Sequence, residues 1–233
     1  MLLDKDIREP LFDFLEDTFG KVRILEEKTI GRSRADVVMV TDSALYGVEI
    51  KSDADTYTRL KSQVKDYDKH YDFNIIVIGT SHAQHIYEHV PDYWGIITVE
   101  DIGGTPDFYM LRKPQANPKM KWEKKLEILW RTELAKIQGM NSMPKYKDKS
   151  KDFIVGKLLE RIPGKLSEET LKEQLSNVLF ERDYNTIASE LKEFHKGELQ
   201  KKIEAETDSE KKLELMMKQS ALKKGFRKRA KRR

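Results

Sequence analysis

The sequence predicts a mixed α/β domain followed by an α-helical region. Up to about residue 115, segments whose apolar residues have the pattern of strands are interspersed with segments whose apolar residues have helical spacing. One of them, the continuous apolar run Phe73–Ile78, is typical of a strand buried on both faces. Beyond Lys113 and Pro114 only helical spacing remains. Helices between strands imply a mixed sheet with right-handed crossovers, so we expect residues 1–115 to form an α/β domain in the order αβββαβαββ.

The elements of this domain are predicted from the spacing of their apolar residues. Over residues 2–19, Ile7, Leu11 and Leu15 recur at helical spacing, and Gly20 ends the pattern. Strands are expected over residues 28–30, 35–40, 45–51, 73–78, 95–99 and 108–111, and further helices over residues 56–70 and 81–89.

The second part of the chain is expected to form a helical subdomain over residues 116–222. Its amphipathic helices are predicted over residues 122–137, 153–161 and 167–181, and a long charged stretch over residues 184–224 follows them. The segment 139–151, GMNSMPKYKDKSK, is rich in turn formers and charge and is predicted to be a linker. This helical part is a candidate surface for a protein partner.

The composition excludes several classes of protein. The 233 residues include no cysteine, which excludes disulfide-stapled folds and thiolate zinc sites. No apolar run approaches the roughly 20 residues that a membrane span needs, and acidic residues rather than a basic segment follow Met1. We therefore expect a cytoplasmic protein without a membrane partner.

Positive charge is concentrated at the C-terminus. The formal charge of the chain is +4, and the eight cations of residues 223–233 (KKGFRKRAKRR) leave residues 1–222 with a net charge of −4. Such a basic tail is either a solvated chain end or a segment that binds a phosphate backbone by releasing counterions. The candidate nucleic-acid-binding residues of the tail are Lys223, Lys224, Arg227, Lys228, Arg229, Lys231, Arg232 and Arg233.

A predicted hairpin brings three charged residues together. The strands ADVVMV and LYGVEIK flank the segment 41–44, and a turn centred between Asp42 and Ser43 places Asp36 opposite Glu49. Because side chains alternate along a strand, Lys51 lies on the same face as Glu49. One turn therefore delivers two carboxylates and an ammonium group to one patch.

This patch is a candidate metal site. Two neighbouring carboxylates on a mostly apolar sheet oppose each other's ionisation, and a hard divalent cation such as Mg²⁺ or Mn²⁺ removes the conflict. Asp36, Glu49 and the main-chain carbonyl of Ile50 are the candidate ligands, with coordination positions left open for a phosphate and a water. Lys51 is the candidate for orienting or deprotonating that water. The alternative is a solvated salt-bridge face, since 36% of the residues are charged.

These residues, with Gln63 on the following helix, resemble the PD-(D/E)XK nuclease superfamily. The usual Pro-Asp is Ala35-Asp36 here, while the Glu-x-Lys triplet is intact. The resemblance covers residues 5–135, including Leu129–Arg131, and is greatest to small single-domain members of bacteria and phages, among them MmcB-like repair proteins. It implies a restriction-endonuclease-like αβββαβ core.

The resemblance also implies roles for single residues. Asp36 and Glu49 would bind the metal, and Lys51 would serve the attacking water. Gln63, with Tyr67 one turn later, would face the site from the helix between the strands.

Residues around this set are candidates for further roles. The resemblance implies that Glu9 is an additional acidic residue at the edge of the site, whereas the alternative is an acid favoured by the helix dipole. Glu27 is a candidate for an outer-sphere role. Arg34 and Arg59 are close enough in sequence to the site to bind a phosphate in a bidentate fashion, while Arg32 is as readily explained by surface solvation.

Two other features have competing explanations. His82, His85 and His89 lie at helical spacing and could bind zinc, but an exposed amphipathic helix explains them equally well. Asp55 is predicted to be the N-cap of the helix that carries Gln63.

The sequence therefore predicts a metal-dependent nuclease that hydrolyses DNA phosphodiester bonds. One alternative is a nucleic-acid-binding or interaction module that keeps the fold without useful turnover. Another is a toxin or antiphage effector whose activity needs a partner. Endo- and exonuclease action, single- and double-stranded substrates, DNA and RNA, and roles in repair and defence all stay open.

Deleting residues 223–233 should weaken DNA binding at low salt and flatten its salt dependence, because the slope follows the number of phosphates that the protein neutralises, about 0.9 per contact. Anisotropy titrations of labelled DNA at several salt concentrations measure both quantities. An unchanged affinity and slope would reassign the tail to a protein partner, to an RNA or to solubility.

Overall fold

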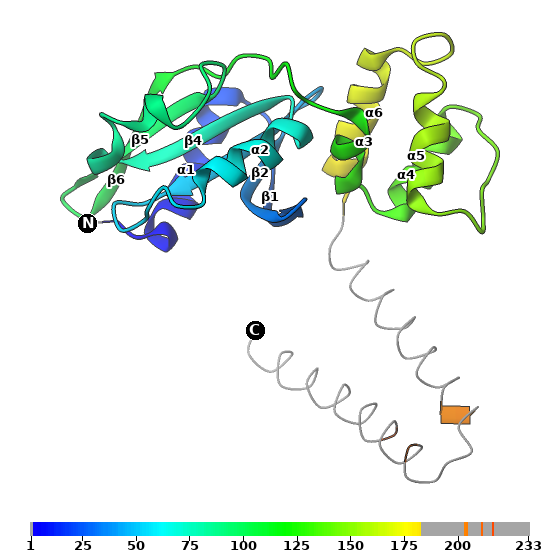
Figure 1. The fold of residues 1–233 in the computed structure, drawn as a ribbon, viewed down its shortest axis with the longest axis horizontal. Coiled ribbons are helices and arrows are strands. Elements are labelled where there is room, and N and C mark those ends of the chain that lie inside the picture. Colours follow the sequence, from blue (N-terminus) through cyan, green and yellow to red (C-terminus); the bar gives the residue numbers. More distant parts are fainter. Residues whose placement is uncertain (1, 183–202, 205–210, 212–215, 217–233) are drawn as a thin grey trace. The chain divides into compact units, whose positions relative to one another are not determined.

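The computed structural model describes residues 2–182, 203–204, 211 and 216. The chain divides into two units, residues 1–181 and 182–233, and the first contains the sheet and the helices between residues 4 and 180 (Figure 1). The domain boundary predicted at residue 115 falls inside this first unit. The basic tail and nearly all of the charged stretch over residues 184–224 lie outside the described residues.

A six-stranded mixed sheet forms the centre of the first unit, which confirms the predicted α/β class. The strands lie in chain order, with β1 to β3 antiparallel, β3 to β5 parallel, and β5 and β6 antiparallel. Gly103 and Gly104 join β5 to β6 in a tight turn, and both have positive φ angles, which glycine adopts without strain. The strands are β1 (Arg23–Ile30), β2 (Ser33–Val40), β3 (Leu45–Lys51), β4 (Phe73–Gly79), β5 (Gly95–Ile102) and β6 (Thr105–Arg112).

Residues 2–182 contain six α-helices and three short 3₁₀ helices. None of the described helices combines the length and the apolar character needed to cross a bilayer. The α-helices are α1 (Asp4–Phe19), α2 (Leu60–His70), α3 (Trp122–Lys125), α4 (Arg131–Met140), α5 (Lys151–Leu159) and α6 (Glu168–Phe180), and the 3₁₀ helices are η1 (Thr80–His82), η2 (Ile86–Glu88) and η3 (Leu126–Ile128).

Two helix predictions were wrong. The segment 81–89 forms η1 and η2 instead of one helix, because only Ile86 is buried within these two turns and no continuous apolar stripe holds a longer helix against the sheet. The segment 122–137 is interrupted by extended backbone at Leu129 and Trp130. The Trp130 N–H donates to the Glu133 carboxylate at 2.7 Å, so a new helix, α4, begins there.

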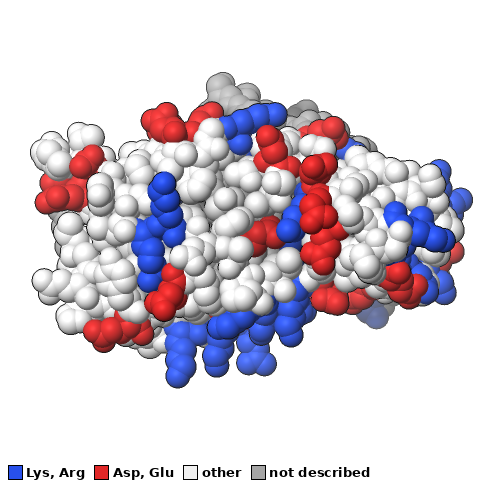
Figure 2. All heavy atoms as spheres, turned by 90° about the horizontal axis from the view of Figure 1, so that it is seen from above, with Lys and Arg blue, Asp and Glu red and all other residues white. Residues whose placement is uncertain are grey.

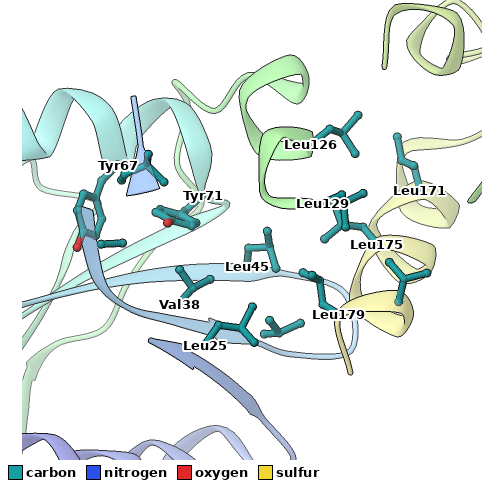
Figure 3. Close-up of a cluster of buried hydrophobic side chains, with 14 of the residues drawn as sticks. Leu25, Val38, Leu45, Tyr67, Tyr71, Leu126, Leu129, Leu171, Leu175 and Leu179 are labelled. Carbon is teal, nitrogen blue, oxygen red and sulfur yellow. The ribbon is translucent and has the colours of Figure 1, made fainter. Parts of the chain in front are cut away.

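Each face of the sheet is covered by a different set of helices. Ile7, Leu11 and Leu15 of α1 pack on the face that carries Val48 and Ile50. The opposite face belongs to a larger cluster that includes α2 and the helices after β6. Figure 3 shows leucines of the sheet beside those of the later helices; the labelled residues are Leu25, Val38, Leu45, Tyr67, Tyr71, Leu126, Leu129, Leu171, Leu175 and Leu179. The segment 139–151, predicted as a linker, contains the loop between α4 and α5.

A buried ion pair joins the later helices to the sheet. Lys125 Nζ lies 2.6 Å from Asp72 Oδ2, and the side chain of Lys125 has no solvent exposure. Asp72 also accepts a hydrogen bond from the Leu45 N–H at 2.8 Å, so its carboxylate connects α3 to the start of β3. Burial lowers the pKa of Lys125, and the charge of Asp72 opposes this effect.

Replacing Lys125 by Met should lower the free energy of unfolding by about 3–5 kcal/mol, because it leaves the Asp72 carboxylate buried without its partner. The double variant Lys125→Met/Asp72→Asn should recover part of this loss, since it removes the remaining charge. Denaturant titrations measure both effects, with Lys124→Met as the exposed control. Equal stability of Lys125→Met and Lys124→Met would contradict the role of the pair.

Candidate active site

The β2–β3 hairpin has the predicted register. Val37 pairs with Val48 and Val40 with Leu45, and this last pair closes the turn. The ladder ends at the pair of Val37 and Val48. Asp36, the residue before Val37, uses its carboxylate instead: the Ile50 N–H donates a hydrogen bond to Asp36 Oδ2 at 2.9 Å. The Asp36 side chain therefore accepts the hydrogen bond that a main-chain carbonyl of β2 would accept in a continuing ladder. Asp36 lies where β2 and β3 stop pairing.

The pairing of β2 with its other neighbour, β1, is also irregular at Asp36. The β1–β2 ladder continues on either side of Glu27 and Asp36 but omits this pair, and Glu27 has a positive φ of 50°. Ala35 and Val38 belong to the same core cluster although they are three residues apart, whereas regular alternation would place them on opposite faces. The alternation of side chains between the two faces of the sheet is therefore interrupted around Asp36. Strands show such interruptions at bulges, which are common beside functional sites.

Glu49 lies at the centre of a buried hydrogen-bonded group. Lys51 Nζ donates to its Oε1 at 2.5 Å, and the Tyr67 hydroxyl donates to its Oε2 at 2.7 Å. Gln63 Nε2 also donates to Oε1. The side chain of Glu49 is 0% exposed and that of Lys51 is 8% exposed. This degree of burial argues against the solvated salt-bridge face.

Gly47 allows α2 to approach the sheet closely enough for these contacts. A Cβ atom at Gly47 would lie 2.2 Å from the Tyr71 ring and 2.6 Å from the Tyr67 ring. The absence of a side chain in the middle of β3 therefore lets Tyr67 lie against the sheet, with its hydroxyl at Glu49.

The surroundings of Asp36 make the ionisation of its carboxyl group costly. Burial, and next the charge of Glu49, raise the pKa of Asp36 to about 7. The Ile50 N–H and the cations of Lys51 and Arg8 act in the opposite direction but do not cancel the shift. Burial and the nearby Glu49 also raise the pKa of Tyr67 well above its usual value, so its hydroxyl remains a donor. The site therefore holds a carboxyl group whose ionisation is costly at neutral pH.

A cavity of about 630 Å³ opens at this point. Asp36, Glu49 and Lys51 line it together with Gln63 from α2, so four of the predicted catalytic residues converge. Arg34 and Arg59, the two predicted phosphate-binding arginines outside the tail, also line it. The complete lining is Asp4, Arg8, Glu27, Thr29, Arg32, Ser33, Arg34, Asp36, Glu49, Ile50, Lys51, Asp55, Arg59, Ser62 and Gln63.

The structure does not bring Glu9 into the site. Glu9 is exposed and does not line the cavity, because the inward face of α1 is set by Ile7 and Leu11. Instead α1 contributes Arg8, which the sequence reasoning missed. Arg8 lies 3.6 Å from the Asp36 carboxylate and is held by Asp4 at 2.8 Å. The spacing of Asp4 and Arg8, one helical turn apart, was the only sequence signal for this pair.

Two neighbouring acids have other partners than expected. Asp55 is not the N-cap of α2, which begins after Arg59. It accepts hydrogen bonds from the main-chain N–H and the hydroxyl of Ser52, at 2.9 and 2.7 Å, and thereby shapes the turn after Lys51. Glu27 lies 3.4 Å from Arg34 at the exposed rim of the cavity.

The three histidines do not form a metal site. His82 and His89 lie against the ring of Tyr57, with centroids 4.8 and 4.3 Å away, and His85 pairs with Glu88. The helix that would have aligned them is absent.

The oxygen atoms of the cavity suit a hard cation better than a soft one. Within the described residues, no group of three or more His, Asp or Glu side chains is arranged to hold a metal ion. Asp36 and Glu49 provide two carboxylates, and Ile50 lines the same cavity. Gln63 Oε1 is buried without a hydrogen-bond partner. Two carboxylates and an unsatisfied amide oxygen are hard oxygen donors, a set that fits Mg²⁺ or Mn²⁺.

Asp36→Asn should stabilise the protein without divalent cations by about 2 kcal/mol near pH 8, and this gain should vanish toward pH 4. An acid with a raised pKa binds its proton more tightly in the folded state, so stability falls as the pH rises from about 4 to about 7. Denaturant titrations in EDTA across this range, with Asp42→Asn as the exposed control, measure the difference. Parallel profiles of wild type and Asp36→Asn would contradict a costly charge at Asp36.

Comparison with known families identifies the chain at the level of a family. No curated protein and no solved structure gives a significant match to it. The model of one protein family, bacteriophage P4 protein cII, matches residues 2–228. This match includes all the described residues, and therefore the whole cavity and the helices that follow the sheet. The chain belongs to the bacteriophage P4 protein cII family.

Proposed function

We propose that this protein is a nuclease of the PD-(D/E)XK type that hydrolyses DNA phosphodiester bonds and requires Mg²⁺ or Mn²⁺. The observation that carries the proposal is the convergence of Asp36, Glu49 and Lys51 in one cavity, at the point where β2 and β3 stop pairing. A surface salt bridge would need neither the burial of Glu49 nor an orphaned oxygen on Gln63.

The order of the elements supports the same proposal. Helix α1, the antiparallel strands β1 to β3, helix α2 and the parallel strand β4 follow one another as the resemblance to these nucleases implies. The Glu-x-Lys triplet lies at the end of β3, and α2 presents Gln63 to it.

Each residue of the cavity has a role in the proposed reaction. Asp36, Glu49 and the carbonyl of Ile50 would hold the divalent cation, which would offset their charge and polarise the scissile phosphate. Lys51 would orient the attacking water and stabilise the negative charge that develops on the phosphate oxygens. Gln63 Oε1 would accept a hydrogen bond from a water in the cavity.

The arginines at the cavity would position the substrate. Arg34 and Arg59 line the cavity, and guanidinium groups bind phosphate oxygens in a bidentate fashion. Arg8, held by Asp4, would limit the negative potential at Asp36.

One observation favours a second candidate, a nucleic-acid-binding module without turnover. Both oxygens of Glu49 already accept hydrogen bonds, from Lys51, Gln63 and Tyr67, so the carboxylate is satisfied without a cation. Metal binding would have to compete with these contacts.

Lys51→Ala should reduce cleavage of linear, single-stranded or nicked circular DNA by about a hundredfold or more, because its charge is used mainly in the transition state. Metal and DNA binding should largely survive. Product analysis in Mg²⁺, Mn²⁺ or EDTA measures the cleavage, and Lys165→Ala, at an exposed position far from the cavity in sequence, is the control. Mg²⁺ should raise the melting temperature of Lys51→Ala but not that of Asp36→Asn.

Undiminished cleavage in EDTA, or full turnover by a folded Lys51→Ala variant, would contradict the mechanism. DNA binding by wild type without cleavage under any of these conditions would favour the module.

A further inference from the structure

Helix α2 has one face made of lysines. Lys61, Lys65 and Lys69 are exposed and follow one another at intervals of four residues, which places them along one side of the helix. The opposite side of α2 carries Leu60 and Tyr67, which are buried in the core. We call the three lysines the α2 lysine row.

The two acids in the second half of the same helix have partners other than this row. Asp66 accepts hydrogen bonds from the Arg32 N–H at 3.2 Å and the Ser33 hydroxyl at 2.7 Å. Asp68 is buried and accepts from the Trp94 indole at 2.9 Å and the Tyr93 hydroxyl at 2.7 Å. Within the described part of the chain, no carboxylate forms an ion pair with any lysine of the row.

Helix stability does not explain the row. Lys69 lies in the last turn of α2, where the helix dipole favours a cation. Lys61, however, lies in the first turn, where the dipole disfavours one, and that turn contains no acidic residue. A ligand with negative charge explains both positions.

The row connects two places on the surface. At its start, Gln63 of the same helix and Arg59, the N-cap residue before it, line the candidate active site. At its end, Lys65 and Lys69 line a second hollow of about 440 Å³ together with Lys119 and Lys121. Asp68 also lines this hollow and pairs with Lys119 at 3.3 Å, so Lys121 is the lysine that adds to the row. The Lys121 N–H donates to the Lys69 carbonyl at 3.0 Å, so the chain of cations continues past the end of α2. Figure 2 shows Lys and Arg side chains gathered along one edge of the molecule.

The spacing of the row suits a polyanion with regular charges. Four residues of α-helix rise about 6 Å, so the three lysines span about 12 Å along the axis. A strand of duplex DNA carries one phosphate per roughly 3.4 Å of its axis, which places three or four phosphates along the row.

We propose that the α2 lysine row, continued by Lys121, binds the phosphate backbone of a nucleic acid strand and leads it into the candidate active site. The inference rests on the proposed function for the identity of the site, but it concerns a binding surface that takes no part in the chemical step. Charge rather than base contacts supplies the affinity, so binding along this surface does not depend on the sequence of the nucleic acid.

The test is a binding titration in EDTA, where no cleavage occurs by the proposed mechanism. The variant Lys61→Gln/Lys65→Gln/Lys69→Gln keeps residues with good helix propensity. The matched control, Lys145→Gln/Lys147→Gln/Lys149→Gln, removes three exposed lysines from the loop between α4 and α5. Anisotropy of a labelled duplex and a labelled single strand of mixed sequence is followed at several salt concentrations.

The row variant should bind about tenfold or more weakly than wild type at low salt, and the slope of log affinity against log salt should fall by about 2–3. The loop variant should keep most of the slope, and Lys→Arg replacements at the three row positions should keep wild-type binding. Circular dichroism and melting temperature verify that the row variant is folded.

An unchanged affinity and slope in the row variant, or equal losses in the row and loop variants, would overturn the proposal. So would binding of the wild type to polyglutamate but to no nucleic acid, which would assign the row to an acidic protein. The wild type could also bind DNA without ever cleaving it. If the row variant then bound DNA more weakly than the wild type, this inference would be supported and the proposed nuclease activity rejected.

Discussion

The hydrogen bond from the Ile50 N–H to the Asp36 carboxylate is the interaction on which the candidate site depends. It lies where the β2–β3 ladder ends and holds the Asp36 carboxylate in the same cavity as the Glu49 carboxylate, which is entirely buried. Beyond this point β2 and β3 no longer pair through their main chains, and charged side chains gather there instead. Arg8 lies at Asp36 and Lys51 at Glu49, and the charges of these two cations partly offset the rise in the pKa of Asp36.

The strands and the hairpin register could be predicted because they depend on local patterns. Alternation along β2 and β3 and a short turn fix which residues face each other, and Val37–Val48 pairing follows from them. The prediction of Glu49 and Lys51 on one face has the same basis. Gln63 could be assigned to the cavity only because a resemblance pointed to it, since its contact with Glu49 spans the connection between a strand and a helix.

The errors have a common cause in tertiary packing. Glu9 and Arg8 are adjacent in sequence, and only the rotation of α1 on the sheet decides which of them meets Asp36. The interruption at Leu129 follows from a side-chain to main-chain hydrogen bond that spacing alone does not reveal. Likewise, no local signal showed that Lys125 would find Asp72 and make the later helices part of the same core.

The small size of Gly47 has a consequence for the whole of helix α2. Because no Cβ separates β3 from Tyr67 and Tyr71, this glycine sets the height of the helix above the sheet. Any larger residue there would lift the entire helix, which is one rigid wall of the cavity and carries Gln63. A substitution at Gly47 would thus change the width of the cavity and the position of every α2 side chain that lines it, although Gly47 itself is buried.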